Sequence, residues 1–229
     1  MTRGYIFDYG GTLDTGGQHW GRLLGRLYQQ AGVPVSEEQF REAYVHAERT
    51  LGKTPIIQSS YSFRETLDAK LRIELEYLVD MLQQPSLMQY HDPLVNSAWN
   101  VAAEYTAKSA VVLRQLAQQY SLVLVSNFYG NIHVILSEFG LADCFTSVIE
   151  SAVVGMRKPD PAIFQLGVDA LHLPAHEVTV VGDSISKDIM PARKIGCQTV
   201  WLRSEGWTDD PVDESVPDSI ITCLEDLLV

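Results

Sequence analysis

Short, largely apolar runs alternate with helical segments through the second half of this chain. The runs are 122–125, 145–149, 178–181 and 199–202, and one more lies at 5–7 near the N-terminus. The helical segments between them are 132–139, 162–171 and 185–195. Runs rich in Val and Leu without polar alternation are typical of parallel strands covered on both faces. Strands that alternate with helices therefore predict an α/β fold with a doubly wound parallel sheet.

The region between residues 18 and 84 has no such run, and its apolar residues recur at helical spacing. Ser36 and Gln39 fit the capping box that starts a helix. We therefore predict an α/β core formed by 1–16 and 90–229, with an inserted all-helical domain at 17–89 and a boundary around 83–93. The alternative is a helical N-terminal domain in which the first strand is only an edge, but the glycine-rich turn after that strand disfavours it. Near the C-terminus, we expect 211–218 to be an exposed loop ahead of a final helix.

The charge of the chain restricts its partners. A net charge of −12 argues against general binding to nucleic acid or to an anionic membrane, since no basic surplus would displace counterions. It leaves room for an anionic small molecule. The sequence shows no apolar stretch of membrane-spanning length, and we expect no signal peptide because the N-terminus enters a predicted strand directly. Three scattered cysteines (Cys144, Cys197 and Cys223) are typical of buried thiols in a reducing compartment, so we expect a cytoplasmic location.

Four groups of polar residues follow predicted strands. They are Asp8 with Thr12, Ser126 with Asn127, Lys158 in a proline-containing loop, and Asp183 with Asp188. Taken singly, each has a plain structural explanation as a turn former, helix cap or solvated side chain. Taken together they favour a site, because the carboxyl ends of parallel strands share one crevice. Carboxylate oxygens without His or Cys partners favour Mg²⁺ over zinc.

In order and spacing, these segments resemble the motifs of the haloacid dehalogenase (HAD) superfamily. The matching features are the strand-Asp-x-x-x-Thr opening, the Ser-Asn, the Lys-Pro, and the Gly-Asp-Ser with a downstream Asp. The resemblance covers the whole chain, including the position of the helical insertion, which would be a cap domain.

The resemblance implies a role for each residue. Asp8 would be the nucleophile and a Mg²⁺ ligand, and Gly10 would offer its backbone carbonyl to the metal. Asp183 would be a further metal ligand, and Asp188 a ligand or a partner of the lysine. Thr12, Ser126 and Asn127 would bind substrate, and Lys158 would stabilise the charge of the phosphoryl group. The implied activity is a phosphatase acting on a small phosphorylated metabolite through an aspartyl-phosphate.

Gly10 departs from this pattern, because phosphatases of the superfamily usually carry an Asp there as general acid and base. Such catalysis contributes about 10²–10⁴-fold, so its absence raises the barrier by roughly 3–5 kcal/mol. His19 is a nearby titratable group, but a His-Trp pair at a helix start is more often packing and capping.

Two other activities stay open. A phosphonatase-like enzyme would form a Schiff base on a cap lysine, with Lys53 and Lys70 as candidates. A HAD-fold protein with weak or no catalysis would instead bind phosphate for regulation, although it would have little need for all of the motif residues.

A dehalogenase is disfavoured because Tyr9 is one residue away from the aromatic position of that branch.

Overall fold

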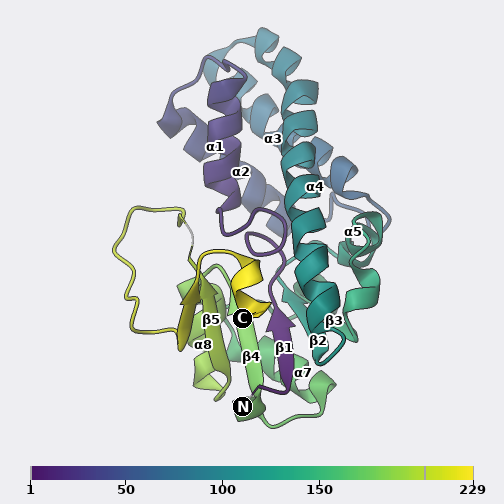
Figure 1. The fold of residues 1–229 in the computed structure, drawn as a ribbon. Coiled ribbons are helices and arrows are strands. Elements are labelled where there is room, and N and C mark those ends of the chain that lie inside the picture. Colours follow the sequence, from purple (N-terminus) through teal and green to yellow (C-terminus); the bar gives the residue numbers. More distant parts are fainter. Residues whose placement is uncertain (1, 204, 229) are drawn as a thin grey trace.

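The computed structural model describes residues 2–203 and 205–228, and a six-stranded parallel sheet lies at its centre (Figure 1). In spatial order the strands are β3 (Ser147–Glu150), β2 (Ser121–Ser126), β1 (Gly4–Phe7), β4 (Val178–Gly182), β5 (Gln198–Leu202) and β6 (Ser219–Ile221). Successive strands run outward from β1 first to one edge and then to the other. This arrangement confirms the doubly wound α/β fold, with its switch point between β1 and β4.

Helices cover both faces of the sheet, as the apolar strands require. Side chains alternate along each strand, so Phe7 enters one core and its neighbour Ile6 enters another on the opposite face. The Phe7 core includes residues of α4 (His91–Leu116) and α5 (Ile132–Glu138). The Ile6 core includes residues of α7 (Pro161–Leu171) and α8 (Met190–Lys194). A short helix, α6 (Ser151–Val154), follows β3 directly.

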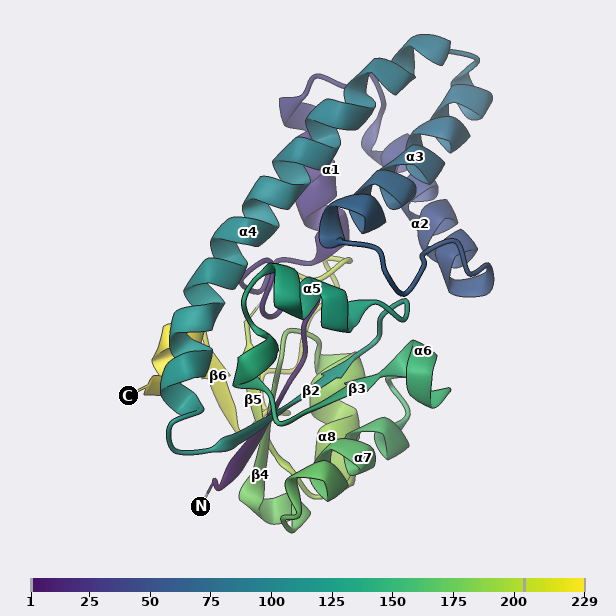
Figure 2. The same cartoon turned by 90° about the vertical axis from the view of Figure 1, so that its right-hand side faces the viewer.

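Three helices form a separate layer beyond the carboxyl ends of the strands (Figures 1 and 2). They are α1 (Trp20–Gln30), α2 (Glu37–Lys53) and α3 (Phe63–Leu82), and we call them the helical unit. Ser36 caps α2 in the predicted capping box, and Ser62 with Glu65 forms a second box at the start of α3. The long helix α4 packs against α3 and α1 and then continues down beside the sheet.

The structure differs from the sequence-based expectations at three places. The expected boundary at 83–93 is largely helical: a 3₁₀ helix (Pro85–Tyr90) leads into α4, whose first turn tolerates Pro93. The segment 185–195 is a π-helix (Ile185–Ile189) followed by α8. The loop at 211–218 is largely exposed, as expected, and a 3₁₀ helix (Leu224–Leu228) follows it, but the edge strand β6 lies between the two and was not predicted. None of the helices in the described part of the chain has the length and apolar character needed to cross a bilayer.

Candidate active site

The candidate site lies where β2, β1 and β4 end side by side. Asp8 directly follows β1, Ser126 is the last residue of β2, and Asp183 directly follows β4. Because these strands are parallel neighbours, their carboxyl ends meet at one edge of the sheet. The three residues line one cleft of about 590 Å³ with Gly10, Asn127, Lys158 and Asp188. That volume is in the range of small-molecule sites.

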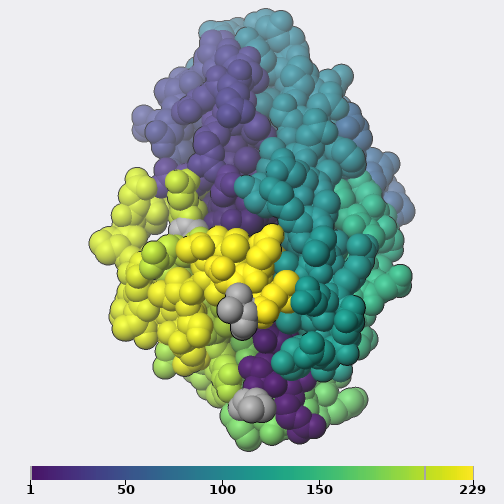
Figure 3. All heavy atoms as spheres, in the orientation of Figure 1, coloured from purple at the N-terminus to yellow at the C-terminus, as the bar shows by residue number. Residues whose placement is uncertain are grey.

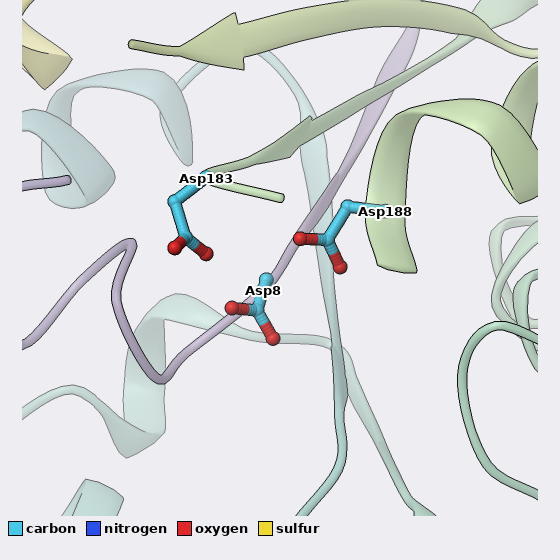
Figure 4. Close-up of side chains that lie close together, drawn as sticks. All are labelled: Asp8, Asp183 and Asp188. Atoms are coloured by element: carbon cyan, nitrogen blue, oxygen red, sulfur yellow. The ribbon is translucent and has the colours of Figure 1, made fainter. Parts of the chain in front are cut away.

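Three carboxylates and one lysine meet at the base of this cleft. Lys158 Nζ lies 2.5 Å from Asp8 Oδ1 and 2.7 Å from Asp188 Oδ1, and all three side chains are buried. Asp8, Asp183 and Asp188 each offer an oxygen within 4.8 Å of the others. Figure 4 shows the three carboxylates facing one shared space. The sequence-predicted acids and lysine are therefore brought together.

Burial and crowding of like charges perturb these groups. Burial raises the pKa of Asp8 to about 6, against the opposing effect of Lys158 and with a further rise from Asp188. Burial, Asp188 and Asp8 raise the pKa of Asp183 well above its ordinary value. Burial would lower the pKa of Lys158, but Asp188 and Asp8 raise it overall, so the ammonium is retained. Three carboxylates against one ammonium leave the cluster short of positive charge, which is the environment that a divalent cation stabilises.

The turn after Asp8 is held against the loop that carries Asp183. The Thr12 hydroxyl lies 3.3 Å from Asp8 Oδ2 and accepts a hydrogen bond of 3.1 Å from the Asp183 backbone N–H. Gly11 has a φ of +97°, and a Cβ there would lie 2.6 Å from Asp183 Oδ2. Only glycine fits at that position. Thr12 thus joins the two acidic loops, in addition to its predicted role toward substrate.

Asp14 is a buried carboxylate that the sequence analysis left without a role. It accepts hydrogen bonds from the Gly11 backbone N–H at 2.7 Å and from Trp20 Nε1 at 2.8 Å. Burial raises the pKa of Asp14 to about 7, although both hydrogen bonds oppose the rise. Because Trp20 is the first residue of α1, Asp14 ties the turn to the helical unit. Its place six residues after Asp8 was visible in the sequence, but its partner was not.

Asn127 makes a contact that the sequence did not predict. Its Nδ2 donates to the Lys158 backbone carbonyl at 3.1 Å, and its Oδ1 accepts from the Lys158 backbone N–H at 2.9 Å. This pair of bonds fixes the loop that carries the lysine. Ser126 is buried and lines the cleft.

Gly10 also lines the cleft, and a Cβ built on it meets nothing within 4 Å. The first atom of an Asp side chain at position 10 would therefore meet no steric clash.

The other sequence candidates have defined surroundings. His19 caps α1, where its Nδ1 accepts from the Gly21 backbone N–H at 3.0 Å, which confirms the capping role. Burial lowers the pKa of His19 to about 4, so the ring is neutral with its proton on Nε2. Tyr9 is fully buried with its ring against Phe128.

The two candidate lysines of the helical unit differ in their surroundings. Lys70 is buried and paired with Glu48 at 2.5 Å. Burial would lower the pKa of Lys70, but Glu48 raises it well above its usual range, which keeps the amine protonated and disfavours Schiff-base formation. Lys53 is exposed and lines the cleft.

Comparisons with known proteins agree with this geometry. A family model described as haloacid dehalogenase-like hydrolase matches residues 2–196. The chain is 32% identical over 116 residues to 5-amino-6-(5-phospho-D-ribitylamino)uracil phosphatase of Escherichia coli, which covers 50% of this chain and 47% of that protein. The chain thus spans about half the length of this curated relative.

Two further comparisons cover nearly the whole chain. Haloacid dehalogenase-like hydrolase domain-containing protein 3 of Danio rerio is 27% identical over 226 residues, with 90% of this chain and 88% of that protein covered. The solved structure of a magnesium-bound HAD hydrolase from Bacillus subtilis aligns with a TM-score of 0.60 at 18% identity. That alignment covers 99% of this chain and 96% of the other, and it shows that the fold is shared.

Proposed function

This chain belongs to the haloacid dehalogenase-like hydrolase family, and we propose that it is a Mg²⁺-dependent phosphatase acting on a small phosphate monoester through an aspartyl-phosphate at Asp8. One observation carries this proposal: a buried carboxylate at the end of the central strand contacts a buried ammonium, with two more carboxylates beside it. The phosphatase name of the Escherichia coli relative supports the reaction class.

The proposed reaction has two displacements at phosphorus. The Asp8 carboxylate attacks phosphorus, the bond from phosphorus to the ester oxygen breaks, and the phosphoryl group stays on Asp8 as an acyl phosphate. The leaving oxygen takes a proton from solvent and departs as the alcohol. Water then attacks the same phosphorus and gives up a proton to solvent, which releases inorganic phosphate and regenerates the carboxylate. Lys158 holds Asp8 Oδ1 and offers positive charge next to the transferring group. Ser126, Asn127 and Thr12 stay our proposed substrate-binding residues.

The acidic cluster fits a hard divalent cation. Three buried carboxylates supply oxygen ligands, and the charge they carry exceeds that of Lys158. Asp8, Asp183, Asp188 and the Gly10 carbonyl would hold Mg²⁺. When bound, Mg²⁺ would neutralise charge on the phosphoryl group. The chain's own residues supply the nucleophile and the ammonium.

We propose that the helical unit, within residues 17–89, is a cap that closes the cleft from above and excludes water. Its residues Tyr44, Glu48 and Lys70 line the same cleft as Asp8. The wall opposite the nucleophile would therefore contact the leaving group. Cys144 and Cys197 are buried as expected, whereas Cys223 is exposed, so the expectation was wrong for that residue. All three are free thiols, which fits the proposed cytoplasmic location.

The test is phosphate release from 4-nitrophenyl phosphate and from a panel of phosphorylated metabolites, with and without Mg²⁺. We expect Mg²⁺-dependent turnover, and Asp8→Asn should reduce it at least about a thousandfold. Asp143→Asn, at an exposed position outside the cleft, serves as the control and should leave the rate unchanged. Undiminished turnover in Asp8→Asn would rule out the proposed nucleophile. No turnover by wild type on any substrate would favour a phosphate-binding protein instead.

A further inference from the structure

An ion pair in the helical unit forms part of the cleft wall that faces the acidic cluster. Lys70 on α3 and Glu48 on α2 lie 2.5 Å apart, and both line the cleft that contains Asp8. The Lys70 side chain is 9% exposed, whereas that of Glu48 is 40% exposed. Tyr44 contacts Lys70, Tyr129 approaches Glu48 and His19 packs on Tyr44, and all three line the same cleft. We call these five residues the Lys70–Glu48 wall.

The hydrogen-bonding capacity of this wall is only partly used. Lys70 has three N–H groups; one meets Glu48 Oε1, and the ammonium lies 4.5 Å from the centre of the Tyr44 ring. The Tyr129 hydroxyl also approaches Glu48 Oε1, at 3.4 Å. Both of these contacts are to Oε1 of Glu48, whose side chain is partly exposed to the cleft. His19 keeps its Nε2–H available because its Nδ1 accepts from the backbone.

The wall therefore places acceptors and donors next to one another, and the Lys70–Glu48 pair at its centre carries no net charge. Glu48 offers an acceptor oxygen, whereas Lys70 and His19 offer donors. A hydroxyl group both donates and accepts, so it can satisfy the two members of the ion pair at once. Adjacent hydroxyls on one ligand can use several of these groups together.

A charged leaving group matches this wall poorly. A carboxylate that approaches Lys70 also approaches Glu48, and an ammonium that approaches Glu48 also approaches Lys70. The repulsion between the ligand carboxylate and Glu48, or between the ligand ammonium and Lys70, weakens binding of these charged esters. Lys53, Arg157 and Lys187 also line the cleft, and their side chains are exposed, so solvent weakens their field. Of these three, Lys187 also acts on the wall, since its charge lowers the pKa of both His19 and Glu48. All three attract the phosphate dianion whatever alcohol it is attached to.

Resting on the proposed phosphatase function, we infer that the Lys70–Glu48 wall selects an uncharged, hydroxyl-rich leaving group, so that the substrates are polyol or sugar phosphates. Glu48 and Lys70 are then specificity-determining residues, and they take no part in the chemistry at phosphorus. Esters whose leaving group carries a carboxylate or an ammonium are poor substrates.

The experiment compares kcat/KM for four phosphate monoesters with Mg²⁺ present. They are a pentitol phosphate, 3-phosphoglycerate, phosphoethanolamine and 4-nitrophenyl phosphate. We expect the wild type to prefer the pentitol phosphate over both charged esters by at least about tenfold. In Glu48→Gln, Lys70 loses its counter-charge, so activity on the pentitol phosphate should fall about tenfold while that on 3-phosphoglycerate rises. The rate with 4-nitrophenyl phosphate should change little.

Two further variants complete the design. Glu104→Gln breaks an exposed Lys–Glu pair of 2.7 Å on α4, outside the cleft, and should leave all four ratios unchanged. The double variant Glu48→Gln/Lys70→Gln removes both charges of the pair, and the buried Glu74, which Lys70 also influences, can take up a proton. It therefore keeps the test valid if Glu48→Gln fails to fold. It should lose the polyol preference without gaining activity on 3-phosphoglycerate.

The outcomes separate this inference from the proposal beneath it. Turnover of 4-nitrophenyl phosphate with no preference for the polyol ester would overturn the inference and leave the phosphatase function standing. A polyol preference that persists unchanged in the double variant would also overturn it, since the wall would not be its source. Absence of turnover on all four esters would refute the phosphatase function and the inference with it.

Discussion

At the scale of single residues, Asp8 provides the nucleophile of the proposed reaction, whereas Gly10 leaves it without a general acid and base. Asp8 supplies a nucleophile in contact with Lys158, but Gly10 offers no side chain to protonate a leaving alcohol or to activate water. An aryl phosphate needs little protonation of its leaving group, whereas an alkyl phosphate needs more. The absence of the acid should therefore affect alkyl esters most.

Restoring the acid should raise the rate. Gly10→Asp fits the cleft, since a Cβ there meets nothing within 4 Å, and we expect turnover of an alkyl phosphate to increase about 10²-fold. Steady-state kcat on glycerol 3-phosphate is the measurement. Gly10→Asn is the matched control, because it adds the same bulk without a titratable proton. Equal rates in the two variants would show that proton transfer does not limit this enzyme.

Glu74 provides a separate test, of stability, inside the helical unit. It is fully buried, with Oε2 3.1 Å from the Tyr28 hydroxyl, and burial raises the pKa of Glu74 from 4.5 to about 7. The folded state thus binds the proton more tightly than the unfolded state does. Between those pH values the free energy of unfolding should fall as the pH rises, by on the order of 2–3 kcal/mol from this group.

Glu74→Gln should remove that dependence. The free energy of unfolding of the variant minus that of wild type should therefore rise as the pH increases from about 4.5 to 7. Urea unfolding at a series of pH values measures this difference. Glu76→Gln, at an exposed position on the same helix, should show no such trend. A constant difference between Glu74→Gln and wild type across this range would contradict the raised pKa.

At the scale of elements, the loop after β5 docks on the helical unit (Figures 1 and 3). The Trp207 ring lies 4.9 Å from that of Tyr44 and 5.4 Å from that of His19. The Arg41 guanidinium lies 4.0 Å from the Trp207 ring centre and donates to its backbone carbonyl at 3.0 Å. A loop of the sheet region thus contacts the same helices that line the cleft.

Trp207→Ala should release this loop. We expect faster tryptic cleavage after Arg203, measured by mass spectrometry under native conditions, because the aromatic and cation–π contacts are lost. Val212→Ala changes an exposed side chain of the same segment and should leave the cleavage rate unchanged. If both variants are cleaved like wild type, the Trp207 contacts do not hold the loop.

The sequence predicted the strands that are long and continuously apolar, and it missed a short edge strand and a helix whose first turn contains proline. The Val-rich runs identified β2 and β4 because both faces of those strands are buried. The edge strand β6 has only three residues, one of them an exposed serine, so its pattern is too short to read. The start of α4 was missed because Pro93 suggested a boundary, although proline is accommodated in the first turn of a helix.

At the scale of the whole molecule, the parallel topology explains why the site could be predicted. Asp8, Ser126 and Asp183 meet because their strands end at one edge, so recognising the strands was enough to place them together. The Lys70–Glu48 pair and the Trp207 contacts depend on how helices pack across the cleft. No local pattern encodes that packing, and the sequence therefore did not reveal those contacts.

Metal binding should couple the acidic cluster to global stability. A ligand that binds only the folded state at about a hundredfold excess over its Kd adds about 2.7 kcal/mol. We therefore expect Mg²⁺ to raise Tm by about 5–10 °C, measured by thermal unfolding with and without EDTA. Asp183→Asn should abolish this shift, and Asp143→Asn should preserve it. The same shift in both variants would place the metal elsewhere.

The central claim is that the phosphoryl group passes through Asp8. Because Gly10 offers no base to activate water, the acyl phosphate should accumulate during turnover of 4-nitrophenyl phosphate. The most direct measurement is to quench the reaction, reduce with borohydride and map the peptides by mass spectrometry, since reduction converts an aspartyl-phosphate to homoserine. We predict homoserine at position 8. Continued turnover with Asp8 unmodified, or with the label on Asp183 or Asp188, would contradict the mechanism.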